Sequence, residues 1–519
     1  MKLVSVSQMR AIEKEADASG LTYANMMENA GRELAEVVLD LPFIEDQEIE
    51  ILGLVGPGNN GGDTLVALDY LAHEGFKARA YLIKRKSEND ELVARVLDAG
   101  GEIISAESDI NSQALEYYLA TANILLDGIL GTGAKPPLKK DMAEVFVKVL
   151  GTIAQLEDPP FVVAVDCPSG TDCDTGEVPP EAIPADLTVT MAAVKQGLLK
   201  LPTFEYVGEL KVVDIGLPDN LRSLKDLTID VAEDDLVSAL LPDRPLNAHK
   251  GTFGTVLIVA GSVSYTGAAL MAGKAAYRVG TGLVTLAVPE PLHAALAGQF
   301  PEATWAVLPH ESGFISSQAV DVLKNNLDRA TALLIGPGFG LEDPTRKFVE
   351  NILPEIKLPV VFDADGLKLL SQVEDWHEKI PAPAVLTPHP GEMSVMTGLS
   401  KDEIQNNRQE IALKYAREWD HILILKGAFT VIASPDGRMT IIPVASPTLA
   451  RAGTGDVLAG LIVGLRAQGL EAYEAAVAGA WIHARAGLEA GLRLGGSASV
   501  LAGDVLEAVP AVLAELDAG

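Results

Sequence analysis

Residues 449–460 form a glycine-rich turn with one carboxylate, followed by an apolar run at helical spacing. A helix that begins near Gly455 would direct its unpaired N–H groups and positive dipole end toward the turn and create an anion hole. A carboxylate cannot itself bind phosphate there, so Asp456 is better suited to take a proton from a hydroxyl group. The stretch therefore predicts a phosphate site with an adjacent base. The alternative is a helix start that is merely capped by Gly and Asp.

A second glycine-rich turn, Gly-Pro-Gly-Asn-Asn-Gly-Gly-Asp, occupies residues 56–63. It follows a predicted strand over 48–55 and precedes a predicted helix over 65–73, an arrangement that holds phosphate on backbone amides. Asn59 and Asn60 carry donor and acceptor atoms that could face a sugar, a phosphate or a monovalent cation. A turn alone would also explain Asn-Gly-Gly.

Two further predicted strands in the first half end in carboxylates. Residues 124–127 end at Asp127 before a Gly-Thr-Gly loop, and residues 161–165 are followed by Asp166. Because the carboxyl ends of parallel strands share one edge of a sheet, these loops are expected to converge on one ligand. Taken singly, each aspartate could be a helix cap.

The elements that position these residues alternate between strand and helix along the whole chain. In the second half, predicted strands over 255–260, 283–288, 332–335, 360–362, 384–387 and 422–425 end in loops, several of them rich in glycine. This alternation predicts an α/β protein with two doubly wound parallel domains. The charged, proline-punctuated segment 219–243 places the boundary near Ser223, which gives domains 1–222 and 223–519.

Composition limits the class of protein further. The chain has 519 residues, is 48% hydrophobic and carries a formal charge of -32, which argues against non-specific binding to nucleic acid or an anionic membrane. Two cysteines exclude a disulfide framework and favour a reducing compartment. The first residues predict an amphipathic helix capped near Ser7 and no signal peptide. We expect a soluble, cytoplasmic protein.

Three motifs of the first half, at residues 59–63, 131–133 and 166–170, resemble the YjeF N-terminal family of NAD(P)HX epimerases. That resemblance implies a Rossmann-like domain that interconverts the C6 epimers of hydrated NADH and NADPH (NADHX and NADPHX). It implies that Asp166 shuttles the proton and that Asn60, Asp127 and Ser169 bind potassium. The substrate-binding residues it implies are Asn59, Asn60, Gly61, Gly62, Asp63, Gly131, Thr132, Gly133, Ala134, Lys135, Pro136, Pro137 and Asp166.

The second half, from residue 250 to Asp456, resembles the ribokinase-like superfamily and more narrowly the ADP/ATP-dependent NAD(P)HX dehydratases. The narrower resemblance depends on the motifs at residues 336–340, 389–392 and 426–430. It implies that the nucleotide phosphorylates the C6 hydroxyl of the S epimer, with Asp456 as the base, and that phosphate then leaves. It implies substrate contacts at Ala268, Gly338, His389 and Asp456, nucleotide contacts at Lys426, Gly427, Ala428, Phe429, Thr430 and Gly455, and magnesium held through water by Asp363 and Glu392.

The chain departs from these families at a few positions. Thr64 replaces a usual glycine and is expected to add a β-carbon beside the phosphate path. Asp69 stands where arginine is common and is expected to remove a charge partner, and Ala134-Lys135 replaces a bulkier residue and an arginine. Arg451-Ala452 stands where a small pair is usual, so Arg451 could add a positive charge near the phosphates.

Other interpretations remain open at this stage. The second half could be a small-molecule kinase of ribokinase-like type with the first domain as a binding module, or the first domain could bind RNA or have decayed into a structural partner. His389 could merely order its loop, and Lys426 could extend to solvent from its strand end. The family resemblance also suggests a homo-oligomer.

Overall fold

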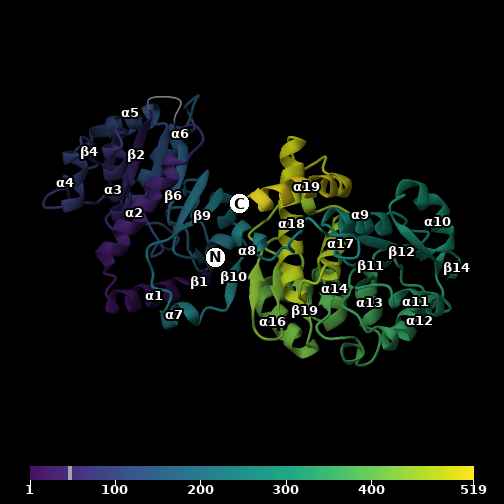
Figure 1. The fold of residues 1–519 in the computed structure, drawn as a ribbon. Helices are drawn as coiled ribbons and strands as arrows, with labels where there is room; N and C mark the ends of the chain where they lie inside the picture. Colours follow the sequence, from purple (N-terminus) through teal and green to yellow (C-terminus); the bar gives the residue numbers. More distant parts are fainter. Residues whose placement is uncertain (45–48, 519) are drawn as a thin grey trace. The chain divides into compact units, whose positions relative to one another are not determined.

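The computed structural model describes residues 1–44 and 49–518 and divides the chain into two compact units, Met1–Leu227 and Thr228–Gly519 (Figure 1). The division falls a few residues beyond the expected boundary because a short helix, α7 (Arg222–Lys225), belongs to the first unit. The carboxylate of Glu15 accepts hydrogen bonds from the backbone N–H groups of Arg222 and Ser223, each at 2.9 Å. These bonds hold the end of the first unit against its opening helix.

The first unit is built on a parallel sheet that has seven strands within the described residues, in the order β4-β3-β2-β5-β6-β7-β9. The strand order reverses between β2 and β5, the kind of position at which open α/β sheets bind ligands. A short parallel pair, β1 (Leu3–Val4) with β8 (Val194–Lys195), lies beside it. The main strands are β2 (Glu50–Val55), β3 (Lys77–Leu82), β4 (Glu102–Ser105), β5 (Ile124–Gly128), β6 (Phe161–Val165), β7 (Leu187–Met191) and β9 (Glu209–Val213).

Helices cover both faces of this sheet. Successive residues of a strand point to opposite faces, so Ile51 packs with the helices α1 to α4 whereas Leu52 packs with α5 and α6. The doubly wound arrangement predicted for this half is therefore confirmed. The helices are α1 (Val6–Ala18), α2 (Tyr23–Leu39), α3 (Asn59–His73), α4 (Glu91–Asp98), α5 (Gln113–Thr121) and α6 (Lys140–Ile153).

Two helix starts differ from the sequence-based prediction. Helix α3 begins at Asn59 and not at residue 65, because Gly58 serves as its N-cap and the Asn-Asn-Gly-Gly segment forms its first turn. Helix α1 is capped by Ser5 and not by Ser7, since Ser5 and Gln8 form a reciprocal capping box. Strand β2 begins at Glu50, and the predicted start at Glu48 lies outside the described residues.

The second unit contains a larger sheet with ten strands in the part of the chain that the structure describes, in the order β10-β21-β20-β19-β18-β17-β16-β11-β12-β13. Most neighbours are parallel, but β20 runs antiparallel to both β19 and β21. The prediction of an all-parallel sheet was wrong there, because the five residues between β19 and β20 are too few for a crossover helix. The strands are β10 (Ile229–Val231), β11 (Thr255–Val259), β12 (Leu283–Pro289), β13 (Thr304–Leu308), β16 (Ala332–Ile335), β17 (Val360–Phe362), β18 (Val385–Leu386), β19 (Ile422–Leu425), β20 (Val431–Ala433) and β21 (Met439–Ile441), with a separate hairpin of β14 (His310–Glu311) and β15 (Phe314–Ile315).

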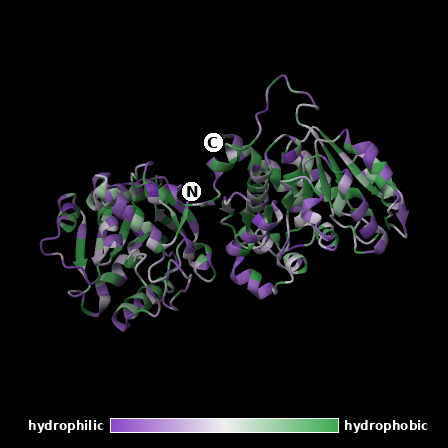
Figure 2. Ribbon diagram, turned by 90° about the horizontal axis from the view of Figure 1, so that it is seen from below, coloured by the Kyte–Doolittle hydropathy of each residue, from purple (hydrophilic) through white to green (hydrophobic). Residues whose placement is uncertain are grey.

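The sheet of the second unit is also covered on both faces, and its apolar strands contribute to one hydrophobic cluster on each face (Figure 2). Helix α17 packs closely on α9, since a β-carbon at Gly460 would lie 2.2 Å from the carbonyl oxygen of Ala272. None of the helices in the described ranges combines the length and apolar character needed to cross a membrane. The helices are α8 (Asp234–Ser238), α9 (Ala268–Arg278), α10 (Glu290–Leu296), α11 (Ala319–Leu327), α12 (Asp343–Ile352), α13 (Asp365–Leu370), α14 (Pro390–Thr397), α15 (Lys401–Asn406), α16 (Arg408–Trp419), α17 (Thr454–Ala467), α18 (Ala472–Arg493) and α19 (Ala502–Ala518).

Candidate active sites

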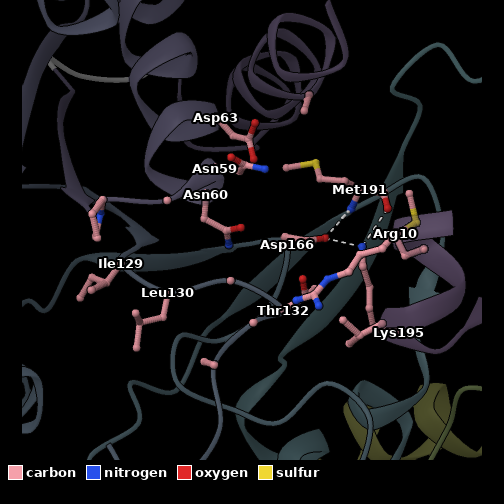
Figure 3. Close-up of a pocket in the computed structure, with 18 of the residues that line it drawn as sticks. Arg10, Asn59, Asn60, Asp63, Ile129, Leu130, Thr132, Asp166, Met191 and Lys195 are labelled. Atoms are coloured by element: carbon pink, nitrogen blue, oxygen red, sulfur yellow. Dashed lines mark hydrogen bonds and ion pairs between the residues drawn. The ribbon is translucent and has the colours of Figure 1, made fainter. Parts of the chain in front are cut away.

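A cavity of about 980 Å³ opens in the first unit at the carboxyl ends of β2, β5 and β6 (Figure 3). It lies where the strand order reverses, and three predicted loops converge on it, at residues 57–63, 129–137 and Asp166. Of the predicted substrate-binding residues, most line this cavity: Asn59, Asn60, Asp63, Gly131, Thr132, Gly133, Ala134, Lys135, Pro137 and Asp166.

Asn60, which follows β2, contacts the ends of β5 and β6. Its amide nitrogen donates to the carbonyl oxygen of Val165 at 2.5 Å, and the loop after β5 passes so close that a β-carbon at Gly131 would lie 2.1 Å from its Oδ1. Gly61 is similarly close, since its β-carbon would lie 2.0 Å from the carbonyl oxygen of Gly56. These approaches explain why the start of α3 needs glycine.

The three predicted potassium ligands also lie around the loop after β5. Asp127 is fully buried, and its Oδ2 accepts a hydrogen bond from the Ser169 N–H at 3.0 Å. Its Oδ1 is buried without a hydrogen-bond partner among the described residues, and burial raises the pKa of Asp127 to about 6. The Ser169 hydroxyl contacts the backbone of Leu130. A buried, unpartnered carboxylate oxygen suits a bound cation.

Asp166 is held by a buried lysine that sequence reasoning missed. Its Oδ1 accepts hydrogen bonds from Met191 N–H at 3.0 Å and from the ammonium group of Lys195 (Figure 3). It also accepts one from Thr190 Oγ1 at 3.1 Å. Asp166 has a φ of +65°, a conformation that residues with side chains rarely adopt, and such strain is common at functional sites. The signal in the sequence was weak, since Lys195 is simply the one charged residue of segment 187–199.

Two more carboxyl groups face the same cavity, Asp63 from α3 and Glu13 from α1. Burial is the main cause that raises the pKa of both groups, and the charge of Asp166 adds to it. The guanidinium of Arg10, also from α1, lies next to Gly133 of the loop after β5. The first turns of α1 therefore contribute to the site, which the sequence pattern did not indicate.

The departures of the first half have partners within the first unit. Thr64 is buried, its hydroxyl donates to the Asn60 carbonyl oxygen at 2.7 Å and its methyl group lies against Gly53. Asp69 forms an ion pair with Arg95, with Oδ2 at 2.5 Å from one guanidinium nitrogen. Lys135 lies in the loop, and its ammonium group is 3.2 Å from Asp172 Oδ2.

The second unit has the helix start predicted near Gly455. Gly453, in a left-handed conformation with a φ of +94°, caps α17, which begins at Thr454 and places Asp456 in its first turn. Burial, followed by the charge of Asp363, raises the pKa of Asp456 to about 7. A carboxyl group with this pKa can serve as a base near neutral pH. The guanidinium of Arg451 donates to the Ala498 carbonyl oxygen at 2.5 Å instead of extending over the turn.

Lys426, at the end of β19, belongs to a buried charge cluster and does not extend freely to solvent. Its ammonium nitrogen lies 2.7 Å from Asp363 Oδ1 and 3.6 Å from Glu392 Oε2. Asp363 also accepts a hydrogen bond from Thr387 Oγ1 at 2.6 Å. The two predicted magnesium residues thus lie together beside Lys426, at neighbouring strand ends.

His389 orders the start of α14, which agrees with the interpretation that this histidine orders its loop. Its Nδ1 accepts hydrogen bonds from the N–H groups of Gly391 at 2.9 Å and Glu392 at 3.2 Å, which completes a capping box. Burial lowers the pKa of His389, consistent with an unprotonated Nδ1. Two other predicted substrate residues are adjacent, since a β-carbon at Gly338 would lie 2.9 Å from that of Ala268.

Two residues outside the sequence motifs contact the backbone of this site, Arg408 and His483. The guanidinium of Arg408 donates to the carbonyl oxygens of Leu425 at 2.7 Å and Lys426 at 3.3 Å, directly under the predicted nucleotide loop. His483 of α18 is buried against the backbone carbonyl of Thr454, and burial lowers its pKa to about 4. Both contacts join segments far apart in sequence, so spacing alone could not predict them.

The first unit has a cavity where the strand order of its sheet reverses. The second unit has a glycine-rich helix start with a carboxylate in the first turn. These two features define a two-domain α/β enzyme. A family model described as YjeF-related protein N-terminus matches residues 23–197, and one described as NAD(P)H-hydrate dehydratase matches residues 256–510. The chain belongs to the family of bifunctional NAD(P)H-hydrate repair enzymes.

Relatives in this family match the chain along nearly its whole length. The bifunctional NAD(P)H-hydrate repair enzyme Nnr of Moorella thermoacetica is 37% identical over 526 residues, which cover 100% of this chain and 97% of the relative. The enzyme of the same name from Salinibacter ruber is 36% identical and covers 96% and 93%. A crystal structure of ADP/ATP-dependent NAD(P)H-hydrate dehydratase from Bacillus subtilis, co-crystallised with ATP/Mg²⁺, is 31% identical, covers 55% of this chain and 98% of that one, and has a TM-score of 0.48.

Proposed function

We propose that the protein restores hydrated NADH and NADPH in two steps, one in each unit. The first unit interconverts the R and S epimers at C6 of the hydrated nicotinamide ring. The second unit dehydrates the S epimer with ADP or ATP as the phosphoryl donor. One observation supports this proposal most strongly. The two family models match in this order along one chain, and its relatives align with it over almost the whole length.

In the first unit, the amides at the start of α3 and the loop of residues 131–137 bind the phosphates and sugars of the substrate. This places the hydrated ring at the inner end of the cavity, near Asp166. Asp166 takes up or returns the proton that is transferred during epimerisation, and Lys195 and two further donors hold its Oδ1 in place.

In the second unit, Asp456 removes the proton from the C6 hydroxyl as that oxygen attacks the terminal phosphoryl group of the nucleotide. The N–H groups at the start of α17 stabilise the charge on the phosphoryl group during transfer. Ala268, Gly338 and His389 line the hydrated ring. Residues 426–430 and Gly455 contact the nucleotide. Phosphate then leaves C6 and the dihydropyridine ring forms again.

Two cations complete the proposal. Asn60, Asp127 and Ser169 would hold potassium, which would supply the positive charge that the unpartnered Oδ1 of Asp127 lacks. Asp363 and Glu392 would hold magnesium through water, and magnesium would offset the charge of the nucleotide phosphates. The residues fit such an ion because the charges of Asp363, Asp365 and Glu392 all raise the pKa of Asp456, and Lys426 lowers it. A magnesium ion would add positive charge to this group of carboxylates.

The proposal is tested by incubating the purified protein with mixed R and S NADHX, magnesium, potassium and either ADP or ATP while following the NADH absorbance band. Complete recovery of NADH supports both activities, and the faster nucleotide identifies the donor. Because the R epimer also converts slowly on its own, the Asp166→Asn variant must slow recovery of the R fraction alone.

The alternatives predict other outcomes. Rapid recovery of the S fraction alone would leave the dehydratase and assign the first unit a binding or structural role. No recovery with either nucleotide, together with a phosphorylated product that is retained, would favour a small-molecule kinase. Release of free phosphate in step with NADH formation contradicts that kinase.

A further inference from the structure

We propose that Asp63 is a second catalytic residue of the first site, a general acid that works with Asp166 as the base, and that Lys195 is the positioning residue that keeps these two roles apart. This inference rests on the proposed epimerase function of the first unit. It assigns proton transfer to a residue that the resemblance implies only for substrate binding.

Lys195 acts only through Asp166. Its side chain is 1% exposed, and its ammonium group donates to Asp166, to Thr190 Oγ1 at 3.0 Å and to the Met191 carbonyl oxygen at 2.8 Å. All three N–H bonds are therefore used inside the protein and none is left for a ligand. The ammonium group therefore fixes the position of the Asp166 carboxylate.

Within Asp166, the hydrogen bonds from Thr190, Met191 and Lys195 all fall on Oδ1. The carboxylate lines the cavity, so Oδ2 is the oxygen left to face a ligand there. A carboxylate that is fixed on one oxygen and open on the other is well suited to accept a proton from a water molecule at the ring.

Asp63 has the opposite environment. It is 7% exposed, lines the same cavity, and its side chain makes no ion pair or hydrogen bond with the residues described by the structure. The charged groups that face it are Glu13 and Arg10 from α1, Asp166 after β6 and Lys195 from β8. Burial first, then the charges of Asp166 and Glu13, raise its pKa well above the usual range. Its place in the cavity without an ion pair suits Asp63 to donate a proton.

Two carboxyl groups that line one cavity, one tied to a buried ammonium group and one without an ion pair among the described residues, can divide the roles of base and acid. In the R to S direction, the C6–O bond breaks as Asp63 gives its proton to the departing hydroxyl, which leaves as water. The N1 electron pair forms an N1=C6 double bond. A water molecule then adds to the other face of C6, the electrons return to N1, and Asp166 takes the proton from that water.

The step balances without an oxidant or reductant: one water leaves, one water adds, and one proton passes from Asp63 to Asp166. In the reverse direction the roles are exchanged, as microscopic reversibility requires. The pair therefore shares a single proton, and solvent returns it between turnovers. Each epimerisation exchanges the C6 oxygen with solvent.

The first experiment uses the unaltered protein in water enriched in ¹⁸O, with the R epimer, potassium and no nucleotide. We expect one solvent oxygen at C6 for each enzymatic epimerisation, after subtraction of the spontaneous reaction. Epimerisation without oxygen exchange would overturn the inference and leave the epimerase function in place. Absence of any enzymatic epimerisation would overturn the proposed function itself.

The second experiment compares Asp63→Asn with Asp69→Asn, a matched control on the same helix whose carboxylate pairs with Arg95 outside the cavity. We expect Asp63→Asn to lower kcat for epimerisation roughly 10²–10⁴-fold, with KM changed much less, and Asp69→Asn to leave it near the wild-type rate. Dehydration of the S epimer in the same chain reports that the protein has folded. A kcat within about threefold of wild type in Asp63→Asn would overturn the assignment.

The role of Lys195 is read from pH profiles. The acid limb of kcat/KM reports protonation of the base, so Lys195→Met is expected to move that limb to higher pH, and the milder Thr190→Val to move it less in the same direction. Thr190→Val keeps the test decisive if Lys195→Met does not fold. An acid limb that stays in place in the folded variants would remove Lys195 from the inference.

Discussion

The ammonium nitrogen of Lys426 lies 2.7 Å from Oδ1 of Asp363, although the strands that carry them, β19 and β17, are separated by β18. The exposed fractions of the two side chains are 17% and 2%. The pair brings a fixed positive charge to the strand ends that face the start of α17. Asp456 is left with a raised pKa because burial and the nearby carboxylates outweigh the effect of Lys426.

Removing Lys426 should destabilise the second unit. Lys426→Met leaves Asp363 buried without its cation, a change that typically costs about 3–5 kcal/mol. Urea unfolding measures the loss, and Lys426→Met combined with Asp363→Asn should regain part of it, because the uncompensated charge is then absent. Lys368→Met, which breaks the more exposed pair with Asp365, serves as the control and should cost less. A loss below about 1 kcal/mol in Lys426→Met would contradict the expected weight of the pair.

The dehydration rate should rise with pH through about 7, because Asp456 must lose its proton to act as a base. The measurement is kcat/KM for the S epimer with saturating nucleotide between pH 5 and 9. Asp456→Asn should lower kcat roughly 10²–10⁴-fold and leave epimerisation in the first unit unchanged. A flat profile in the wild-type enzyme would argue that another group is the base.

Asp456→Asn should also stabilise the second unit at high pH. The folded pKa of about 7 lies above the unfolded value of about 3.9, so the folded state binds the extra proton and stability falls as pH rises between these values. The asparagine variant carries no such penalty. At pH 8 it should gain at most about 4 kcal/mol, less where water screens the charge, and near pH 4 the gain should vanish. Thermal unfolding at both pH values gives the comparison, and an equal effect at both would count against the raised pKa.

Potassium should stabilise the first unit through Asp127. If the ion binds at the unpartnered Oδ1, the melting temperature rises with potassium concentration because only the folded state offers the site. The control holds ionic strength constant with choline chloride, and Asp127→Asn should abolish the dependence. A potassium effect that persists in Asp127→Asn would place the ion elsewhere.

Gly131 and Gly133 offer a matched pair in one loop. A β-carbon at Gly131 would lie 2.1 Å from Asn60 Oδ1, and Asn60 cannot move easily because it also bonds Val165. At Gly133 the nearest atom is 3.6 Å away, on the guanidinium of Arg10. Gly131→Ala should therefore lower epimerisation at least about tenfold, whereas Gly133→Ala should keep most of it. The NADHX assay measures both, and equal losses would contradict the importance of this approach.

The architecture and the ends of the strands could be predicted from the sequence because both depend on local signals. Strand β6 has the predicted bounds, and the glycine-rich segments do follow β2, β5 and β16. The start of α3 could not be predicted, because Asn-Asn-Gly-Gly suggests a turn unless one knows that Asn60 bonds Val165 across the sheet. Glycine can begin a helix when close backbone approach decides its conformation.

The supporting residues of the sites were beyond sequence reasoning for a different reason. Lys195 reaches Asp166 only because β7 lies beside β6 in the sheet and β8 follows it closely, and Lys426 meets Asp363 from a strand two positions away. A lysine near a strand end usually extends to water, so its type alone predicts exposure. Such pairings depend on tertiary neighbours that residue spacing does not encode.

The two units have separate hydrophobic cores but belong to one chain, and this fixes the ratio in which a cell produces the two active sites. Every ribosomal synthesis of this chain delivers one copy of each sheet and each site, so gene dosage and expression level scale both together. The balance between them can change only through their individual rate constants. Substitutions confined to one core, such as those around Gly460 in the second, therefore offer a route by which that balance can evolve without altering the other half.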